Sequence, residues 1–132
     1  MEIKSSYSNP YYNSDSKSNV ITLKGISIDD NVKDFYTLVL EDISKFLSKP
    51  KNVKVEIDLT YFNTRTSKYL LQIFNLCKDL LKASEYKVTV DWYYDEDDSD
   101  MCEAAQDYES LTGISFTTIP KQPTGIASNK PF

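Results

Sequence analysis

Three hydroxyl residues, Thr64, Thr66 and Ser67, lie where an alternating apolar segment gives way to a helical pattern. The alternating segment covers residues 53–59, and a long apolar helix pattern follows from about Tyr69. The start of a helix presents free backbone N–H groups and the positive end of the helix dipole, which suits a phosphate. A hydroxyl there can cap the helix, or it can be a phosphorylation site. The residue types alone leave both interpretations open.

The residues beside Thr64 allow two roles each. Asn63 can satisfy the backbone of the turn with its side chain, or it can orient a binding partner. Arg65 would be the nearest cation to a phosphate on these hydroxyls, or it is a plain surface residue. A phosphate adds a charge of roughly −1.5 to −2 and three strong acceptors, which a helix N-terminus tolerates. Its main effect would therefore fall on a partner surface shaped for a neutral threonine.

A second segment that could carry chemistry is the acidic run from Trp92 to Met101. Ten of the 20 acidic residues of the chain lie between Glu85 and Glu109, with Lys87 the only base in that span. A hard-cation site is one hypothesis, although residues 95–100 lack the glycine that an EF-hand loop needs at its sixth position. Paired catalytic carboxylates are another, but no pocket can be argued from the sequence. The third interpretation is helix capping and solvation, which is compatible with an electronegative docking surface.

Aromatic side chains flank both segments. Tyr61 and Phe62 precede the hydroxyls, and Tyr93 and Tyr94 precede the acids. Aromatic residues beside acids are typical of protein interfaces, although some of these rings must also serve the core. The residues that we expect to contact a partner are Tyr61, Phe62, Asn63, Arg65, Tyr94, Asp95, Asp97 and Asp98.

The composition narrows the class of function. The chain has no histidine, which removes Ser-His-Asp and Cys-His catalysis and histidine metal ligands. Its three glycines do not form a phosphate-binding loop of the Walker or dinucleotide type. A net charge of −5 argues against general nucleic-acid binding, which needs a basic face. We therefore expect a protein that is not an enzyme and that holds no metal and no cofactor.

Hydropathy and cysteine usage favour a cytoplasmic protein. No run of about 18 apolar residues is present that could span a membrane, and residues 1–6 lack the apolar core of a signal peptide. Cys77 and Cys102 fall among apolar neighbours in helical patterns, which fits buried thiols in a reducing compartment. We expect neither a disulfide nor a membrane partner.

Periodicity predicts the elements that position these residues. After a polar lead-in at 1–9, two short strands at 11–13 and 20–24 are expected to form a β-hairpin. The remaining patterns predict helices at 31–48, 66–84 and 98–111 and strands at 53–59, 86–94 and 114–119.

The order ββαβαβαβ predicts a single α/β domain over residues 1–120. We expect a mixed sheet of about five strands with about three helices on one or both faces, followed by a flexible tail at 121–132. If strands 53–59 and 86–94 are parallel, the acidic run leaves the sheet at the same edge as Thr64. The two chemically interesting segments would then form one surface.

The element order resembles the STAS-like fold of anti-sigma-factor antagonists, and the motifs resemble those of one family. Tyr61-Phe62-Asn63-Thr64 with Ser67-Lys68, and the run from Trp92 to Asp98 with Asp100-Met101, are similar to the SiaC family of bacterial regulatory phosphoproteins. Asn9-Pro10-Tyr11 and residues 20–25 match its opening hairpin. The resemblance covers residues 9–120, nearly the whole predicted domain.

The resemblance implies a STAS-like partner-switching protein rather than an enzyme. In this family a threonine is phosphorylated by a dedicated serine/threonine kinase of the histidine-kinase-like ATPase type, and a PP2C-type phosphatase removes the phosphate. The unphosphorylated form binds and activates a diguanylate cyclase, which links the family to cyclic di-GMP and biofilm regulation.

The family's functional residues are assigned to this chain only at the positions that match the family's motif. The threonine of the family's Asn-Thr pair falls on Thr64, which becomes the expected phospho-acceptor ahead of Thr66 and Ser67. Arg65 and Thr66 stand where the family usually has two serines, and this difference bears on the preference of the kinase. The alternative is a small acidic domain that binds a metal or another ligand through the Asp95–Asp100 loop.

Overall fold

The computed structural model describes residues 1–122, which form six strands and three helices. The elements in chain order are β1 (Glu2–Ile3), β2 (Tyr11–Asp15), β3 (Val20–Ser27), α1 (Val32–Phe46), β4 (Val53–Phe62), α2 (Thr64–Leu81), β5 (Val88–Asp95), α3 (Ser99–Thr112) and β6 (Ser115–Lys121). No helix among the described residues is long and apolar enough to cross a membrane. The expected tail at 121–132 begins inside β6, and its last ten residues lie outside the described part of the chain.

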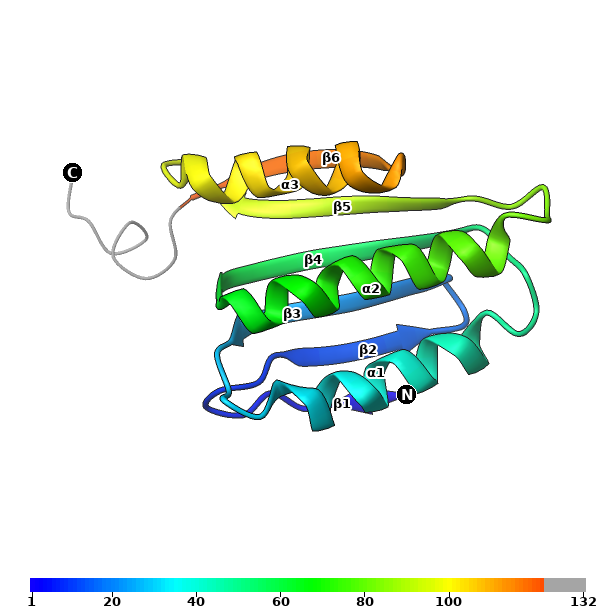
Figure 1. Cartoon of the computed structure of the whole chain (residues 1–132), viewed down its shortest axis with the longest axis horizontal. Coiled ribbons are helices and arrows are strands. Elements are labelled where there is room, and N and C mark those ends of the chain that lie inside the picture. The colour runs from blue at the N-terminus through cyan, green and yellow to red at the C-terminus, as the bar shows by residue number, and fades with distance from the viewer. Residues whose placement is uncertain (123–132) are drawn as a thin grey trace.

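The strands lie in the sheet in the order in which they occur along the chain, from β1 to β6 (Figure 1). The pairs β1/β2 and β2/β3 are antiparallel, whereas β3/β4, β4/β5 and β5/β6 are parallel. The predicted mixed α/β sheet is confirmed, but it has six strands instead of five. The additional strand, β1, pairs Glu2 with Asn13 and Ile3 with Tyr12. Two residues are too few to show an alternating pattern in a sequence.

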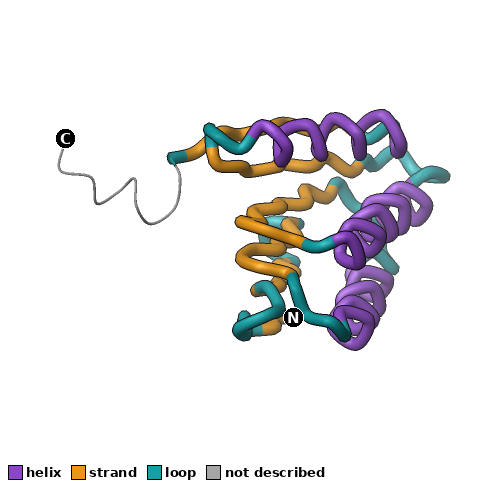
Figure 2. Tube along the Cα trace, turned by 60° about the vertical axis from the view of Figure 1, so that its left-hand side comes forward, coloured by secondary structure: helices purple, strands orange, loops and turns teal. Residues whose placement is uncertain are grey.

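All three helices pack on one face of the sheet, and the opposite face is open to solvent (Figure 2). The alternation along β4 shows why: Val53, Val55, Ile57 and Leu59 are buried beneath the helices, and the residues between them face outward. An apolar stripe on each helix completes a core that includes the single tryptophan, Trp92. Burial of these apolar side chains is the main force that holds the layers together.

A bulge lengthens the middle of the sheet toward the helix starts. The β3/β4 register shifts between Gly25 and Ile26, because Gly25 pairs with Leu59 but Ile26 pairs with Tyr61. Gly25 has φ +122, which is left-handed backbone that side-chain-bearing residues rarely adopt. The two strands therefore run to Ser27 and Phe62, beyond the predicted ends at 24 and 59. A bulge of this kind re-aims the residues that follow it.

Helix boundaries differ from the prediction by one to three residues. Helix α2 begins at Thr64 rather than near residue 66, so that Thr64 and Arg65 belong to its first turn. Polar residues in a first turn add nothing to an apolar stripe, so the periodicity could not reveal them. Helix α3 ends at Thr112 and is followed by Gly113, whose φ of +74 forms a left-handed C-cap.

Candidate functional site: the edge at the carboxyl ends of the parallel strands

Three helices begin at one edge of the sheet, because each follows one of the parallel strands β3, β4 and β5. This edge carries the β4–α2 junction with Thr64 and the β5–α3 junction with the acidic run (Figure 1). The parallel register of β4 with β5, from Val53↔Val88 to Ile57↔Trp92, confirms that both segments leave the sheet at the same edge. Ligands and regulatory groups of α/β domains gather at such an edge.

The N-cap of α2 is Asn63, not a hydroxyl residue. Its backbone is extended (φ −92, ψ 176), and its Oδ1 accepts a hydrogen bond from the N–H of Thr66 at 2.9 Å. The hypothesis that one of the three hydroxyls caps this helix is therefore wrong, because the amide oxygen of Asn63 already fills that place. The three hydroxyls are left with other roles, and those roles differ.

Thr64 is the first residue of α2 and is exposed. Its hydroxyl makes no hydrogen bond within residues 1–122, whereas its carbonyl accepts a hydrogen bond from the Ser67 hydroxyl at 2.6 Å. The backbone N–H groups in the first turn of a helix have no partner within the helix, apart from those that a cap satisfies. Thr64 is thus an accessible hydroxyl beside unsatisfied amide donors.

Thr66 is fully buried, and its hydroxyl joins three elements. Its Oγ1 lies 2.7 Å from Ser27 Oγ and donates to the Ser27 carbonyl at 3.1 Å. Ser27 Oγ is also 2.8 Å from the hydroxyl of Tyr36, which comes from α1. Burial raises the pKa of Tyr36 to about 12. A hydroxyl with no exposed surface is not open to a kinase in the folded protein, so Thr66 is a structural residue here.

Ser67 is half-buried and ties α2 to α3. Its hydroxyl donates to Thr64 O, and its carbonyl accepts a hydrogen bond from Tyr108 OH at 2.8 Å. These contacts fix the backbone under Thr64 from two sides. Ser27, Tyr36 and Tyr108 were not predicted as supports of this site, because their hydroxyls make hydrogen bonds between different elements, which a periodic pattern does not reveal.

The cations beside Thr64 lie between the starts of α1 and α2. Arg65 Nη1 is 3.4 Å from the carbonyl oxygen and from Oδ1 of Asp30, and both side chains are largely exposed. An exposed ion pair of this kind contributes little to stability. Lys33 and Lys68 join them around a hollow of about 260 Å³. Lys68 follows Thr64 by four residues, the spacing that places two side chains on one helix face.

The acidic residues of the β5–α3 junction have different structural roles. Asp98 caps α3, with its Oδ1 accepting from the Met101 N–H at 3.1 Å. Asp95 is half-buried at the end of β5, and its Oδ1 has no hydrogen-bond partner among the described residues. Glu96 and Asp97 are exposed, and the Glu96 N–H donates to the Lys121 carbonyl. The negative charge at this junction is thus partly structural and partly free.

The aromatic residues of the predicted interface separate into two groups. Tyr61 is 59% exposed. Phe62 and Tyr94 are partly buried against the core, and the Phe62 ring meets Trp92 edge-on at 6.2 Å. The neighbouring thiol of Cys102 raises the pKa of Tyr94. Tyr61 is therefore the aromatic side chain that is most available to a partner.

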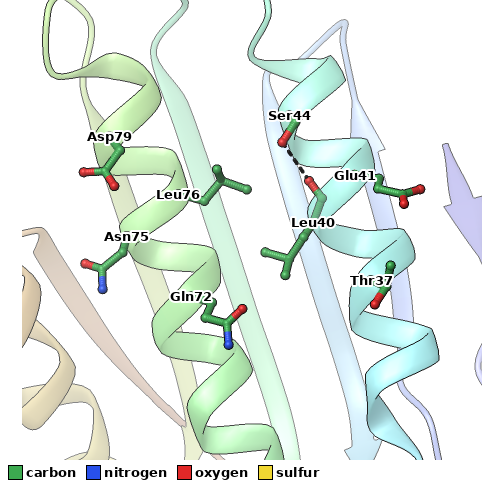
Figure 3. Close-up of a pocket in the computed structure, with 8 residues that line it drawn as sticks. All are labelled: Thr37, Leu40, Glu41, Ser44, Gln72, Asn75, Leu76 and Asp79. Atoms are coloured by element: carbon green, nitrogen blue, oxygen red, sulfur yellow. Dashed lines mark hydrogen bonds between the residues drawn. The ribbon is translucent and has the colours of Figure 1, made fainter.

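The geometry gives little support to the other chemistries considered for this edge. Among residues 1–122, no three Cys, Asp or Glu side chains come together as a metal site would require. A groove of about 520 Å³ between α1 and α2 is lined by Leu40 and Leu76, which point toward each other, and by polar residues (Figure 3). Residues 95–100 line neither this groove nor three further hollows of residues 1–122.

The fold and this edge describe a class of protein: a small α/β domain with an exposed hydroxyl at a helix start and a charged surface at the carboxyl edge of its parallel strands. The comparison with protein families gives the particular one. A model described as SiaC family regulatory phosphoprotein matches residues 3–121, so the chain belongs to this family. The comparison with curated proteins found no match.

Solved structures from Pseudomonas aeruginosa share the fold. A chain in the crystal structure of the diguanylate cyclase SiaD in complex with its activator SiaC superposes with a TM-score of 0.84 at 20% identity, covering 92% of this chain and 99% of that chain. The crystal structure of apo-SiaC gives a TM-score of 0.79 at 20% identity, covering 89% and 96%. Another SiaC structure gives 0.79 at 20% identity, covering 90% and 98%.

Proposed function

We propose that the chain is a partner-switching adaptor controlled by reversible phosphorylation of Thr64. The observation that carries the proposal is the environment of this residue. Thr64 is exposed at the first position of α2, its hydroxyl makes no hydrogen bond within residues 1–122, and the first turn of α2 contains no acid. Membership of a family of regulatory phosphoproteins supports the same assignment. In this proposal the chain itself catalyses no reaction.

A phosphate on Thr64 would be compatible with the fold. It would lie at the positive end of the α2 dipole, next to unsatisfied backbone N–H groups. Lys68, one turn along the helix, would pair with it, and Arg65 would exchange its exposed contact with Asp30 for the stronger phosphate. The domain would stay folded, so the modification would be sensed by whatever binds this edge.

The partner in the unphosphorylated state is proposed to be a diguanylate cyclase. The similarity in fold to a chain of the complex between SiaD and its activator SiaC supports this proposal. The surface offered to it would consist of Tyr61, Phe62, Asn63, Thr64 and Arg65 together with Tyr94, Asp95, Asp97 and Asp98. A dianion in the middle of this surface would lose its water on binding and would lie close to any acid of the partner, and both effects weaken the complex.

Two enzymes would set the phosphorylation state in the cytoplasm. The kinase is proposed to be of the histidine-kinase-like ATPase type, and the phosphatase of the PP2C type. Both must reach Thr64 at the exposed start of α2, which requires no unfolding of the chain. Thr66, in contrast, would require α2 to separate from β3.

The kinase reaction tests the assignment. The purified chain is incubated with MgATP and the family kinase of the same organism, and phosphopeptides are mapped by mass spectrometry. We expect phosphate on Thr64, none in Thr64→Ala, and labelling restored in Thr64→Ser.

Ser99 provides a matched control, because it is the exposed first residue of α3 and follows an N-cap, as Thr64 does. Ser99→Ala should be labelled like the wild type. Full labelling of Thr64→Ala, with the phosphate mapped elsewhere, would refute the proposal.

A further inference from the structure

A second hollow lies at the opposite edge of the sheet, away from Thr64. It forms where α2 ends, where β5 begins and where α3 passes into β6, on the right-hand side of Figure 1. Its volume is about 460 Å³, within the usual range of small-molecule sites. The residues that line it are Lys78, Leu81, Lys82, Ser84, Tyr86, Lys87, Val88, Thr89, Gly113, Ile114 and Ser115.

The charge of this hollow is entirely positive. Its lining contains three lysines, Lys78, Lys82 and Lys87, and no acid. The ion pairs within residues 1–122 use Lys54, Arg65 and Lys121, so none of the three lysines has a carboxylate partner in the described chain. In a protein whose net charge is −5, this concentration of unpaired cations favours an anionic ligand.

The helix dipole accounts for two of these lysines but not for the third. Lys78 donates a hydrogen bond to the carbonyl of Thr112 at the end of α3, where a cation complements the helix dipole. Lys82 is the C-cap of α2, a position that also suits a cation. Lys87, however, lies in the connection after α2, and the dipole effect falls off within the last turn. Its side chain is available to a ligand.

The remaining lining suits a ring rather than an ion alone. Leu81 and Ile114 are buried and form an apolar floor, and Tyr86 beside them is 39% exposed. The Ser84 hydroxyl donates to Leu81 O and accepts from the Tyr86 N–H, which orders the loop that carries the tyrosine. An aromatic face over an apolar floor is typical of sites for flat heterocycles.

Another hollow adjoins this one and contains Lys54, whose ammonium group is paired with Asp91. Its volume is about 370 Å³, and it shares Lys87 and Thr89 with the first hollow and adds the hydroxyl of Ser18. Lys87 therefore lies between two adjoining hollows. A ligand held by its ring at Tyr86 would have room for its charged end along this trough.

We propose that this hollow binds a nucleotide, with the phosphate at Lys82 and Lys87 and the base against Tyr86 and the apolar floor. The chemistry follows from the combination of unpaired ammonium groups, hydroxyls and an exposed aromatic ring in one hollow. The site is separate from Thr64 and does not depend on the partner switch. A nucleotide bound here contacts α2 at its far end, through Leu81 and Lys82.

Titration calorimetry of the full chain tests the proposal with three probes: AMP, ribose 5-phosphate and inorganic phosphate. We expect saturable AMP binding with a dissociation constant of about 1 mM or tighter, and weaker binding of the two probes that lack a base. Undetectable AMP binding at low salt would overturn the proposal. Equal affinity for AMP and ribose 5-phosphate would overturn the assignment of the base to Tyr86.

Substitutions locate the binding. The double variant Lys82→Glu/Lys87→Glu should lose at least about tenfold in AMP affinity, since both phosphate contacts become repulsive. Tyr86→Ala should weaken AMP but leave inorganic phosphate unchanged. The double variant Lys45→Glu/Lys49→Glu is the matched control, because it changes the net charge equally with exposed residues that do not line the hollow. An equal loss in the control would reduce the binding to nonspecific attraction and would contradict the site.

Discussion

The starts of α2 and α3 lie at the same edge of the sheet, but they differ in the charged residues around them. The start of α3 already carries acidic residues: Asp98 caps the helix, Asp100 lies in its first turn, and Glu96 and Asp97 precede it. Helix α2 has a neutral cap, Asn63, no acid in its first turn, and Arg65 and Lys68 close by. A new negative charge should therefore stabilise the start of α2, whereas it should be unfavourable at the start of α3.

The two helix starts also differ in how they are anchored. The start of α2 is tied to β3 and α1 by the buried hydroxyls of Thr66, Ser27 and Tyr36, and to α3 through Tyr108. The start of α3 is held by its cap and by the Trp92 indole, which donates to Met101 O at 3.0 Å. A rigid support under Thr64 means that a charge placed there changes the surface without moving the helix.

The third helix positions, Thr66 in α2 and Met101 in α3, test this difference in anchoring. Thr66→Val keeps the shape but removes the hydroxyl from a buried network, so we expect a loss of about 1–3 kcal/mol in the free energy of unfolding. Met101→Leu conserves volume at a site without such a network and should cost less than about 1.5 kcal/mol. Urea unfolding followed by Trp92 fluorescence measures both. A Thr66→Val variant as stable as the wild type would show that the hydroxyl network is not an anchor.

The first helix positions, Thr64 and Ser99, test the difference in charge. Thr64→Glu should raise the free energy of unfolding by about 0.3–1 kcal/mol, because it places a carboxylate at an uncompensated helix N-terminus. Ser99→Glu should leave it unchanged or lower it, since the new charge joins Asp98 and Asp100. Thermal melts at low and high salt compare them, and the difference should shrink with salt. An identical change in stability for Thr64→Glu and Ser99→Glu would contradict the electrostatic difference between the two helix starts.

Tyr36 gives an effect that is confined to alkaline pH. Burial raises its pKa from the ordinary tyrosine value to about 12, so its neutral form is favoured in the folded state. Its contribution to stability is complete below about pH 10 and is lost as the pH rises toward 12. Tyr36→Phe, which cannot ionise, should show a shallower loss of unfolding free energy over that range. An unchanged slope would indicate that Tyr36 titrates normally in the folded protein.

The architecture of the sheet and the position of its candidate site could be predicted from the sequence because long apolar patterns carry that information. The alternation from Val53 to Leu59 and the stripe from Leu70 to Leu81 predict a strand followed by a helix. A similar strand and helix come next, and parallel pairing of the two strands brings the acidic run to the same edge as Thr64. The family motifs then distinguished Thr64 from Thr66 and Ser67. The structure adds a physical reason for part of that choice, since Thr66 is buried.

The remaining features depend on contacts between elements, which periodicity does not encode. Strand β3 continues past the bulge at Gly25 to Ser27, whose hydroxyl contacts that of Thr66, a residue 39 positions later. The cap on α2 is a local contact, and here the interpretation that the Asn63 side chain satisfies the backbone of the turn is confirmed, because its oxygen accepts a hydrogen bond from the Thr66 N–H. The lysine-lined hollow could not be predicted from the sequence because its residues come from two separate stretches of the chain, 78–89 and 113–115.

The central claim is that a phosphate on Thr64 controls partner binding at this edge. The most direct measurement is the affinity of the diguanylate cyclase of the same organism for the unphosphorylated chain and for the chain phosphorylated on Thr64, by surface plasmon resonance or calorimetry. We predict tight binding of the unphosphorylated form and at least about a tenfold weaker affinity after phosphorylation, with Ser99→Glu far less affected than Thr64→Glu. Equal affinity of the two forms, with the phosphate verified on Thr64, would contradict the account.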